Sequence, residues 1–318
     1  MWSLIRCKQQ LVVPEGHGED NGTMKPPAMP ANHLKKTLKR VPLMGHELRS
    51  WVQRRKYRHL RQLPFNTPIR LHIPTYDGSN QAVHPDVVKS ERGPFPYVLA
   101  MTPYPYNNDR LENPSVVVSQ NGIDYFEPGQ DVNPLVSAPP IDHNDDPDLI
   151  FTDDYYHLFY LETLRPQRQN LVCLQSRDLL SWHRKDVKTY LFGKGSTDPF
   201  IVSPAFVATQ SGFRMYYVNT STTPFQIEMV ESNSILSWHH THPVVMRGPQ
   251  SAGEPWHIDV INAETGLVAL VTFRHARASG KHRYEVWVAR STDGITWQFS
   301  AGPVVAPPVL GSHSVYRA

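Results

Sequence analysis

Carboxylate and imidazole side chains recur along the second part of the chain, each time where a short apolar run begins. Carboxylates that crowd together push their pKa values apart, which lets one group act as an acid and another as a base. Imidazoles beside carboxylates can also hold a metal ion. The pattern therefore favours acid–base or metal chemistry, provided that the fold gathers these side chains. They occur in the segments His84-Pro-Asp86, Asp146-Pro-Asp148, His257-Ile-Asp259 and His313-Ser-Val315, and the equivalent segment Ser203-Pro-Ala205 carries a serine hydroxyl instead.

A second repeat runs in phase with the first: a serine is followed six residues later by an aromatic ring. The serines are 57, 56 and 59 residues apart. We expect the serine hydroxyl to bind loose backbone amides at a corner, and the ring to pack between neighbouring units. We interpret these segments, the Ser boxes, as structural elements without chemistry of their own. They are Ser119–Tyr125, Ser176–Trp182, Ser232–Trp238 and Ser291–Trp297.

The sequence between the two repeats predicts an all-β protein. Each unit holds β-branched and aromatic stretches bounded by turn residues, as in Tyr155–Tyr160 and Phe213–Val218, and such stretches are typical of short strands. A period of nearly 60 residues with four strands per unit indicates a β-propeller. We therefore expect a five-bladed β-propeller over residues 64–318, with blades starting near residues 84, 146, 203, 257 and 313.

A propeller would bring the opening segments together, because the first strand of every blade lines the central channel. The residues that start these strands would then meet at one mouth of the channel. Some of the aspartates would instead only cap turns or bind backbone amides. The converging set is His84, Asp86, Asp146, Asp148, Ser203, His257, Asp259 and His313.

The opening segments resemble those of the five-bladed propeller glycosidases, the glycoside hydrolase family 43, 32 and 68 superfamily. The resemblance covers about residues 80–318 and rests on the blade phase and on short motifs. It implies inverting hydrolysis of a poly- or oligosaccharide, with Asp86 as general base and Asp146 as the residue that tunes pKa and orientation. In the third blade the family has a glutamate as general acid, but this chain reads Ile201-Val-Ser-Pro204.

Three glutamates are candidates for the missing acid. Glu112 is the first choice, because it starts the third strand of the first blade after the loop Thr102–Arg110. Glu254 is the second choice and Glu162 the third. Inverting hydrolysis needs an acid and a base roughly 6.5–9.5 Å apart.

Further residues near the channel mouth are candidates for sugar binding, since aromatic faces with a few polar groups suit small polar ligands. For Trp256 the alternative is packing between blades. The resemblance implies no certain cofactor, although relatives often carry Ca²⁺ in the central channel. His84, His257 and His313 would suit a transition metal better. The full set of expected substrate-binding residues is His84, Asp148, Tyr104, Tyr106, Arg110, Asn113, Ser203, Trp256, His257 and Asp259.

Two other functions stay open. The absent glutamate of the third blade favours a catalytically silent propeller that binds glycans or mounts on a larger particle such as a phage virion. A glycoside phosphorylase is a weaker alternative, supported only by Arg110.

The composition limits these choices. The chain of 318 residues has 40% hydrophobic residues, enough for a core. It contains no apolar run of about 18 residues, so we expect no membrane span. Cys7 and Cys173 are the only cysteines and exclude a disulfide scaffold. The opening Met1-Trp-Ser-Leu-Ile-Arg6 does not resemble a secretory signal.

Residues 1–63 lie outside the repeat and form a separate region. Between His33 and Arg61 there are ten Lys or Arg and one acid, whereas residues 64–318 hold 19 basic and 25 acidic residues. Apolar residues from Leu48 to Leu63 follow helical spacing and predict one amphipathic helix. We expect a flexible basic arm that packs on the propeller or docks it to a protein partner, with nucleic-acid contact less favoured.

We expect the last blade to be incomplete, because its predicted opening strand His313–Arg317 is followed only by Ala318. An open sheet edge favours aggregation. We therefore expect residues 68–74, which have strand character, to lie in the same blade as residues 313–317.

Overall fold

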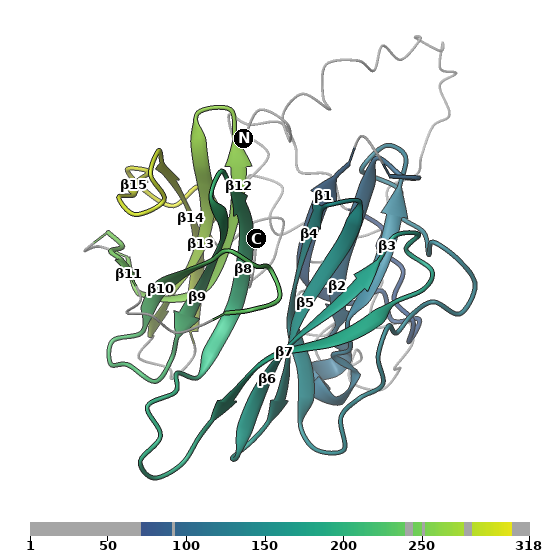
Figure 1. The fold of residues 1–318 in the computed structure, drawn as a ribbon, viewed down its shortest axis with the longest axis horizontal. Helices are drawn as coiled ribbons and strands as arrows, with labels where there is room; N and C mark the ends of the chain where they lie inside the picture. The colour runs from purple at the N-terminus through teal and green to yellow at the C-terminus, as the bar shows by residue number, and fades with distance from the viewer. Residues whose placement is uncertain (1–70, 91–92, 239–243, 250–251, 277–281, 307–318) are drawn as a thin grey trace, which may run out of the picture. The chain divides into compact units, whose positions relative to one another are not determined.

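The computed structural model describes residues 71–90, 93–238, 244–249, 252–276 and 282–306 (Figure 1). The chain divides into two units, Met1–Thr67 and Pro68–Ala318, and the described residues belong to the second unit. The basic arm, its predicted helix and the fifth opening segment at His313 lie outside the described residues. Among the described residues no helix has the length and apolar character to cross a membrane.

Four antiparallel sheets form four consecutive blades, which confirms an all-β propeller. The first blade has the strand order β1-β2-β3, and the other three have four strands each. The strands are β1 Ala82–Lys89, β2 Tyr97–Pro103, β3 Ser115–Ser119, β4 His143–Thr152, β5 Tyr155–Leu164, β6 Arg168–Ser176, β7 His183–Leu191, β8 Ile201–Thr209, β9 Gly212–Asn219, β10 Gln226–Ser232, β11 Val244–Met246, β12 Glu254–Ala263, β13 Gly266–Ala276, β14 His282–Ser291 and β15 Gln298–Phe299.

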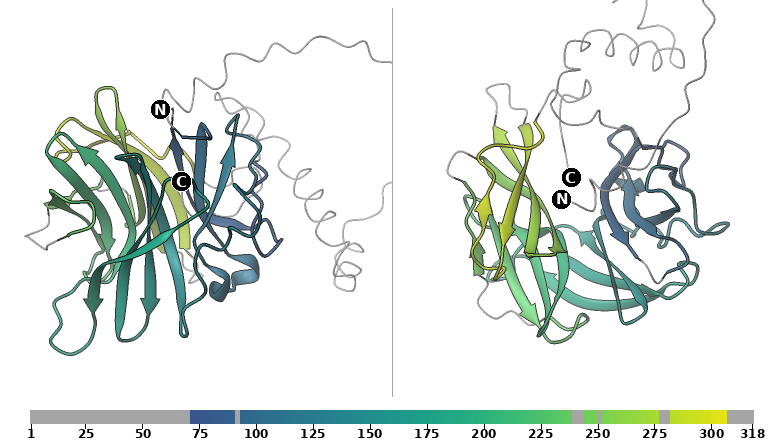
Figure 2. Two further views of the ribbon diagram at one scale, coloured as in Figure 1. Left: turned by 45° about the vertical axis from the view of Figure 1, so that its right-hand side comes forward. Right: turned by 90° about the horizontal axis from the view of Figure 1, so that it is seen from above.

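The opening strand of each blade is the innermost one. β1 contacts β4, β4 contacts β8, and β8 contacts β12, so the first strands of successive blades lie side by side in chain order (Figure 2). Two short 3-10 turns, Pro105–Asn107 and Asp109–Leu111, lie in the connection from β2 to β3. This arrangement gathers the starts of β1, β4, β8 and β12, as the repeat predicts.

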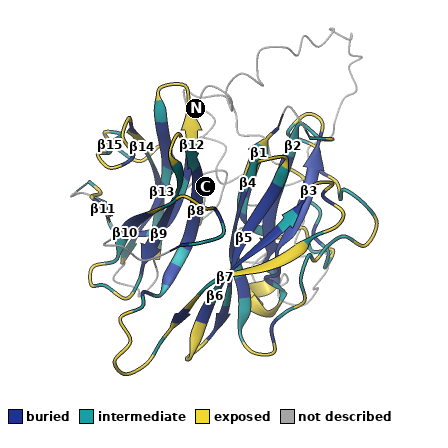
Figure 3. Cartoon of the chain, viewed as in Figure 1, coloured by how far each residue is buried: buried dark blue, intermediate teal, exposed yellow. Residues whose placement is uncertain are grey.

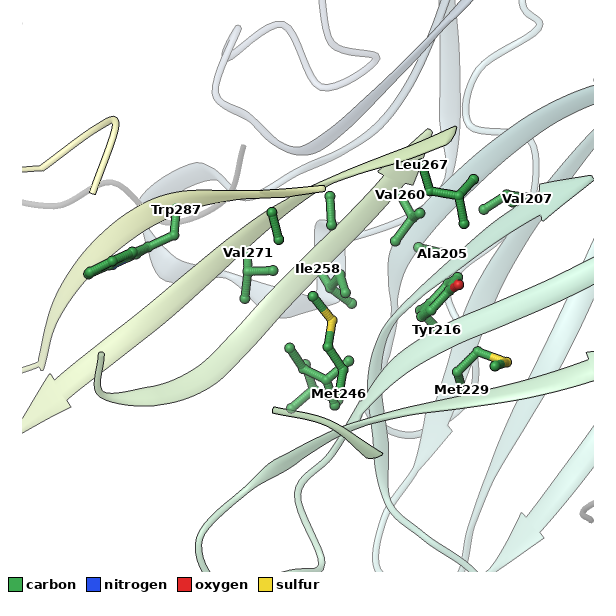
Figure 4. Close-up of a cluster of buried hydrophobic side chains, with 14 of the residues drawn as sticks. Ala205, Val207, Tyr216, Met229, Met246, Ile258, Val260, Leu267, Val271 and Trp287 are labelled. Atoms are coloured by element: carbon green, nitrogen blue, oxygen red, sulfur yellow. The ribbon is translucent and has the colours of Figure 1, made fainter. Parts of the chain in front are cut away.

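The second and third blades are buried on both faces, because alternate residues of a strand point to opposite neighbours. On β5, Leu158 and Tyr160 pack in a core shared with the first blade, whereas Phe159 and Leu161 pack in a core shared with the third. Figure 4 shows the corresponding core between the third and fourth blades, into which Tyr216 and Ile258 point. Figure 3 shows that the middle strands are buried and that the outer strand β7 is mostly exposed.

The Ser boxes have the structural role that the sequence predicts. In the second blade the hydroxyl of Ser176 accepts a hydrogen bond from the backbone N–H of Leu179 at 2.9 Å. The carboxylate of Asp178 accepts from Leu180 and Ser181. The aromatic ring at the end of a box packs between blades, as Trp238 does in the core of the second and third blades. These hydrogen bonds satisfy the backbone amides of a tight corner.

The described part of residues 68–74 lies beside the first blade, and its predicted pairing with residues 313–317 stays a prediction because those residues lie outside the described part of the chain. His72 forms a parallel bridge with Asp124, and Ile73 packs against the core of the first blade. Phe126 pairs with Val118 through two backbone hydrogen bonds, so a short outer segment completes this three-stranded blade. The segment that starts at residue 71 therefore belongs to the first blade, because the outer edge of that sheet offers it a backbone partner.

Candidate functional site

The starts of the opening strands are bulged, and the bulges carry the polar residues. The register of β1, β4 and β8 shifts between Val83 and Asp86, Asp145 and Asp148, and Val202 and Ala205. A bulge inserts an extra residue and re-aims a side chain. The inserted residues have positive φ: 52° at His84, 49° at Asp146 and 54° at Ser203. Such values are uncommon outside glycine and occur preferentially at functional sites.

Two of these residues and one from β12 form a buried cluster, the inner triad: His84, Asp146 and His257. The Oδ1 atom of Asp146 lies 3.6 Å from Nε2 of His84 and 3.5 Å from Nδ1 of His257. The centroids of the two imidazole rings are 5.3 Å apart. All three side chains are at most 5% exposed. The structure thus brings together residues from the first, second and fourth blades.

Further contacts orient the inner triad. The Oδ2 atom of Asp146 accepts a hydrogen bond from the backbone N–H of Ser203 at 2.8 Å, which leaves Oδ1 facing the imidazoles. Nδ1 of His84 lies 3.2 Å from the hydroxyl of Thr102. The hydroxyl of Ser203 donates to the carbonyl of Ile258 at 2.9 Å. Metal-binding histidines and carboxylates usually have such partners on the atom that does not bind the metal.

The geometry of the inner triad fits a small divalent cation. Two ligand atoms on one tetrahedral zinc ion lie about 3.3 Å apart, because each bond is about 2.0–2.2 Å long. The separations of 3.5 and 3.6 Å from Asp146 to the two imidazoles are close to this value, and the three ligand atoms lie within 4.8 Å of one another. Two imidazoles with one carboxylate are a donor set typical of zinc and of non-haem iron.

A second set, Asp86, Asp148 and Asp259, has carboxylate oxygens within 4.8 Å of one another. Oδ2 of Asp86 accepts from the backbone N–H of Leu149 in the next blade at 2.5 Å. In the same way Oδ2 of Asp148 accepts from Phe206 at 3.0 Å. The repetition of this contact indicates that it joins neighbouring blades. These all-oxygen donors are of the type that Ca²⁺ prefers, so the expectation of channel Ca²⁺ concerns this set.

Glu112 lies in a third set at the edge of the site, called the rim cluster: Glu112, His143 and Asp145, with Asp142 and Asp109 around them. Nε2 of His143 is 3.0 Å from Asp145 and 3.8 Å from Glu112, and Nδ1 is 2.6 Å from Asp142. The guanidinium of Arg165 binds both oxygens of Asp142 at 2.7 Å. Asp145 adjoins Asp146 in the chain, so the rim cluster and the inner triad are neighbours.

The rim cluster holds protons at neutral pH. Burial raises the pKa of Glu112 to about 9, and the charge of Asp145 adds to this effect. Burial opposes the charged form of His143, but the hydrogen bond to Asp145 and the surrounding carboxylates raise its pKa to about 9. Burial also raises the pKa of Asp145 to about 6 despite its hydrogen bond to His143. Glu112 is thus a neutral acid beside a charged imidazole.

The other predicted ligand residues have different surroundings. Tyr106 is 86% exposed and has a positive φ of 56°. Arg110 donates to the carbonyl of Asp142 at 2.7 Å, at the rim cluster. Asn113 is buried and bonds to the hydroxyl of Tyr76 and to Asn144, which indicates a structural role. Tyr104 is half-buried on the loop before Glu112.

Trp256 adjoins the inner triad and also packs between blades. Its ring centroid lies 5.6 Å from that of His257 and 6.3 Å from that of Phe225. The guanidinium of Arg274 lies 4.6 Å from the same ring and pairs with Glu254 at 3.0 Å. Glu162, the third candidate acid, pairs with Arg184 at 3.1 Å. Both alternative acids are thus engaged by arginines.

Sequence reasoning missed His143 and Thr102. One signal was present for His143: it stands two residues before Asp145 on an opening strand, and residues two apart share a face. Thr102 carries no such signal, because its role depends on the strand pairing that places it beside His84.

No family model matches the chain. A segment of 80 residues, 24% of this chain, is 35% identical to the A type blood N-acetyl-alpha-D-galactosamine deacetylase of Flavonifractor plautii. This segment spans 10% of that protein.

Two solved structures share the fold of this chain. The crystal structure of an N-acetylgalactosamine deacetylase from F. plautii, in complex with blood group B trisaccharide, superposes with a TM-score of 0.63 at 20% identity, over 76% of each chain. A thermostable family-43 glycoside hydrolase superposes with a TM-score of 0.52 at 18% identity, over 71% of this chain and 74% of the other. The chain has the fold of the five-bladed propeller glycosidases.

This likeness confirms the resemblance in the opening segments as far as the fold. At these identities it carries the architecture and leaves the chemistry to the residues of the site. Neither structure is a virion protein, so the expectation of a virion-associated chain gains no support from them.

Proposed function

We propose that the chain hydrolyses the N-acetyl group of an amino sugar in a glycan, with a divalent cation held by His84, Asp146 and His257. The observation that carries this proposal is the convergence of two imidazole nitrogens, at 3.6 and 3.5 Å, on one carboxylate oxygen. A cation bound there would polarise the acyl carbonyl and acidify a water. Such an ion needs three protein ligands and an open position, and the inner triad supplies the ligands.

The rim cluster supplies the protons that amide hydrolysis requires. The amine that leaves the acyl carbon must be protonated, and a positioned acid does this best when it is still protonated at working pH. Glu112 meets that condition, with a pKa raised by burial to about 9. His143, charged and fixed between Asp142 and Asp145, would hold the Glu112 carboxyl in place and stabilise negative charge on the acyl oxygen.

The substrate class rests on the likeness to a deacetylase of N-acetylgalactosamine and on the loop that leads to Glu112. Tyr106 offers an exposed ring on this loop, and Arg110 lies at the rim cluster. An aromatic face beside a few polar groups suits a sugar ring. Trp256, next to His257, would offer a second ring face from the opposite blade.

The experiment measures metal binding and acetate release on the same protein. Chelator-treated protein is titrated with Zn²⁺ and Mn²⁺ by calorimetry, and released acetate is measured with oligosaccharides that end in N-acetylgalactosamine or N-acetylglucosamine. We expect one tight site, and no binding or release in His257→Ala or in the size-matched Asp146→Asn. His183→Ala, which removes an exposed histidine of β7, serves as the control and should behave as wild type. A folded protein that binds neither metal would overturn the proposal.

Inverting hydrolysis of a glycosidic bond is the second candidate, and the protonated Glu112 favours it as well. Asp86 would be the base, Asp146 the residue that tunes it and Glu112 the acid. The contact of Asp86 with Leu149, however, is repeated by Asp148 with Phe206, which is typical of a structural residue. Asp148→Asn is therefore the matched control for Asp86→Asn. If wild type releases reducing sugar and only Asp86→Asn stops it, this candidate replaces deacetylation.

A further inference from the structure

The Ser box of the third blade departs from the others at its third residue. The first, second and fourth boxes have Asn121, Asp178 and Asp293 there. Each of these side chains accepts hydrogen bonds from the two backbone amides that lie two and three residues further on. The third box has Ser234, whose shorter side chain accepts a hydrogen bond from the N–H of Leu236 at 3.3 Å.

Neighbouring side chains cover the second and fourth boxes. In the fourth, the hydroxyl of Tyr216 in the third blade donates to the carbonyl of Gly294 at 2.8 Å, and Arg214 donates to the carbonyl of Asp293. In the second, the guanidinium of Arg177 lies 4.3 Å from the ring of Tyr155. These contacts place a tyrosine hydroxyl and guanidinium groups at the two corners.

The residues at the equivalent positions differ at the third box. Phe159 of the second blade takes the place of Tyr216, since it pairs with Asp148 as Tyr216 pairs with Ala205, and a phenyl ring has no hydroxyl to donate. Asn233 takes the place of Arg177 and is shorter. A smaller side chain within the box and the lost cover both leave space at this corner.

A cavity of about 460 Å³ opens there, within the size range of small-molecule sites. It lies at the far end of β8 from Ser203, about 20 Å along the strand. Its walls are mostly hydroxyl and amide groups, with one aromatic ring and one carboxylate. The lining residues are Thr209, Ser211, Phe213, Glu231, Ser232, Asn233, Ser234 and Ser237.

We propose that this cavity binds one unit of a neutral saccharide and so forms a second glycan-binding site on the propeller. Hydroxyl and amide side chains both donate and accept hydrogen bonds, as sugar hydroxyls do. Glu231 accepts from Arg214 at 2.8 Å and, at 61% exposed, can accept from further hydroxyls. Phe213 offers an apolar face. The inference does not depend on the proposed function, because it uses none of the residues of the inner triad or rim cluster.

Affinity electrophoresis through gels that contain galactomannan, arabinoxylan or β-glucan tests the site. We expect at least one polymer to retard the wild-type protein. Ser211→Trp, which places an indole in the cavity, should weaken binding at least about tenfold, equivalent to about 1.4 kcal/mol. Thr265→Trp makes the same change at the corresponding turn of the fourth blade, one residue before Gly266 as Ser211 is before Gly212, and should change nothing.

Ser234→Asp is the second variant, and it restores the repeat. An aspartate would accept hydrogen bonds from the backbone N–H groups of Leu236 and Ser237, as Asp293 does from those of Ile295 and Thr296. The protein should therefore keep or gain thermal stability, while the polymer gel no longer retards it. The proposal is overturned if no polymer retards wild type, or if both cavity variants bind as wild type does. It is also overturned if His257→Ala alone abolishes retardation, because the inner triad would then bind the glycan.

Discussion

The two ends of each blade are built from the same repeat but use polar groups in opposite ways. At the Ser boxes, side chains such as Ser176 and Asp178 bind backbone amides of their own corner. At the starts of the opening strands, Asp146 reaches Ser203 in the next blade and faces His84 and His257 from two others. The first kind of contact is local and the second joins distant parts of the chain.

Backbone strain follows the same division. His84, Asp146 and Ser203 adopt positive φ inside bulged strands, where glycine would cost less. A proline follows each of these three residues in the sequence. Strained residues persist when the surrounding structure holds them and when function depends on their position. The starts of the opening strands are therefore locally strained, and this strain places polar side chains close to one another. The Ser boxes, by contrast, stabilise the fold.

The largest effect that separates the two regions is on metal affinity. Thr102→Val removes the hydroxyl beside Nδ1 of His84 and keeps the size of the side chain. Loss of such an orienting partner typically costs 10–100-fold in metal affinity, and we expect a fall of this order in calorimetric titrations. Thr163→Val is the control, since the hydroxyl of this buried threonine accepts a hydrogen bond from Gln169 within the second blade. Equal metal affinity in both variants would show that Thr102 does not orient His84.

A smaller effect, on stability alone, is expected at a corner. Ser176→Ala leaves the buried backbone N–H of Leu179 without its acceptor, and an unsatisfied buried donor costs about 1–3 kcal/mol. Chemical denaturation should show this loss, while metal affinity stays at the wild-type value. A metal affinity that falls together with stability would mean that the corners and the inner ends are coupled, contrary to the division between local and long-range contacts.

The sequence predicts the strands and blades well because the information is local and repeated. Turn residues and apolar stretches such as Tyr155–Tyr160 recur at nearly constant spacing. The box from Ser176 to Trp182 predicts a turn whose side chains bind its own backbone amides. The same phase predicts which residues line the channel. His84, Asp146 and His257 are found together because they occupy equivalent positions in three blades.

The composition of the site is harder to predict, because it depends on distances between blades. The resemblance implies one catalytic site with Asp86 as base and Asp146 as the residue that tunes it, but Asp86 bonds to Leu149 and Asp146 faces two imidazoles. The bulges decide this difference, since one inserted residue turns a side chain to the other face of a strand. The bridge between His72 and Asp124 is a tertiary contact of the same kind, which no local pattern in the sequence indicates.

The rim cluster gives a pH dependence that a corner does not. The pKa of Glu112 is raised from its ordinary value to about 9, so the unfolded chain ionises before the folded one as pH rises. The free energy of unfolding is therefore highest below about pH 4.5 with respect to this group and falls as pH rises towards about 9. Glu112→Gln cannot ionise and should gain stability over wild type as pH rises, in thermal melts with chelator present. Glu254→Gln, which removes a half-buried carboxylate paired with Arg274, is the control, and an equal pH trend in both variants would contradict the assignment.

The smallest expected effect on the propeller is that of deleting the arm, residues 1–63. We propose that the arm is a separate region, which binds a protein partner through its basic stretch 33–61. Deletion of these residues should leave a protein whose thermal transition, metal affinity and glycan retardation match those of the full chain. The residues of the inner triad, of the rim cluster and of the cavity at the third Ser box all lie beyond residue 70. Pull-down with full-length and truncated chains would then show a partner retained only by the former. Reversal of charge at Arg54, Arg55 and Lys56 within the full chain is the matched test of the basic stretch. Aggregation of the truncated chain with collapse of its thermal transition would show instead that the arm is part of the propeller core.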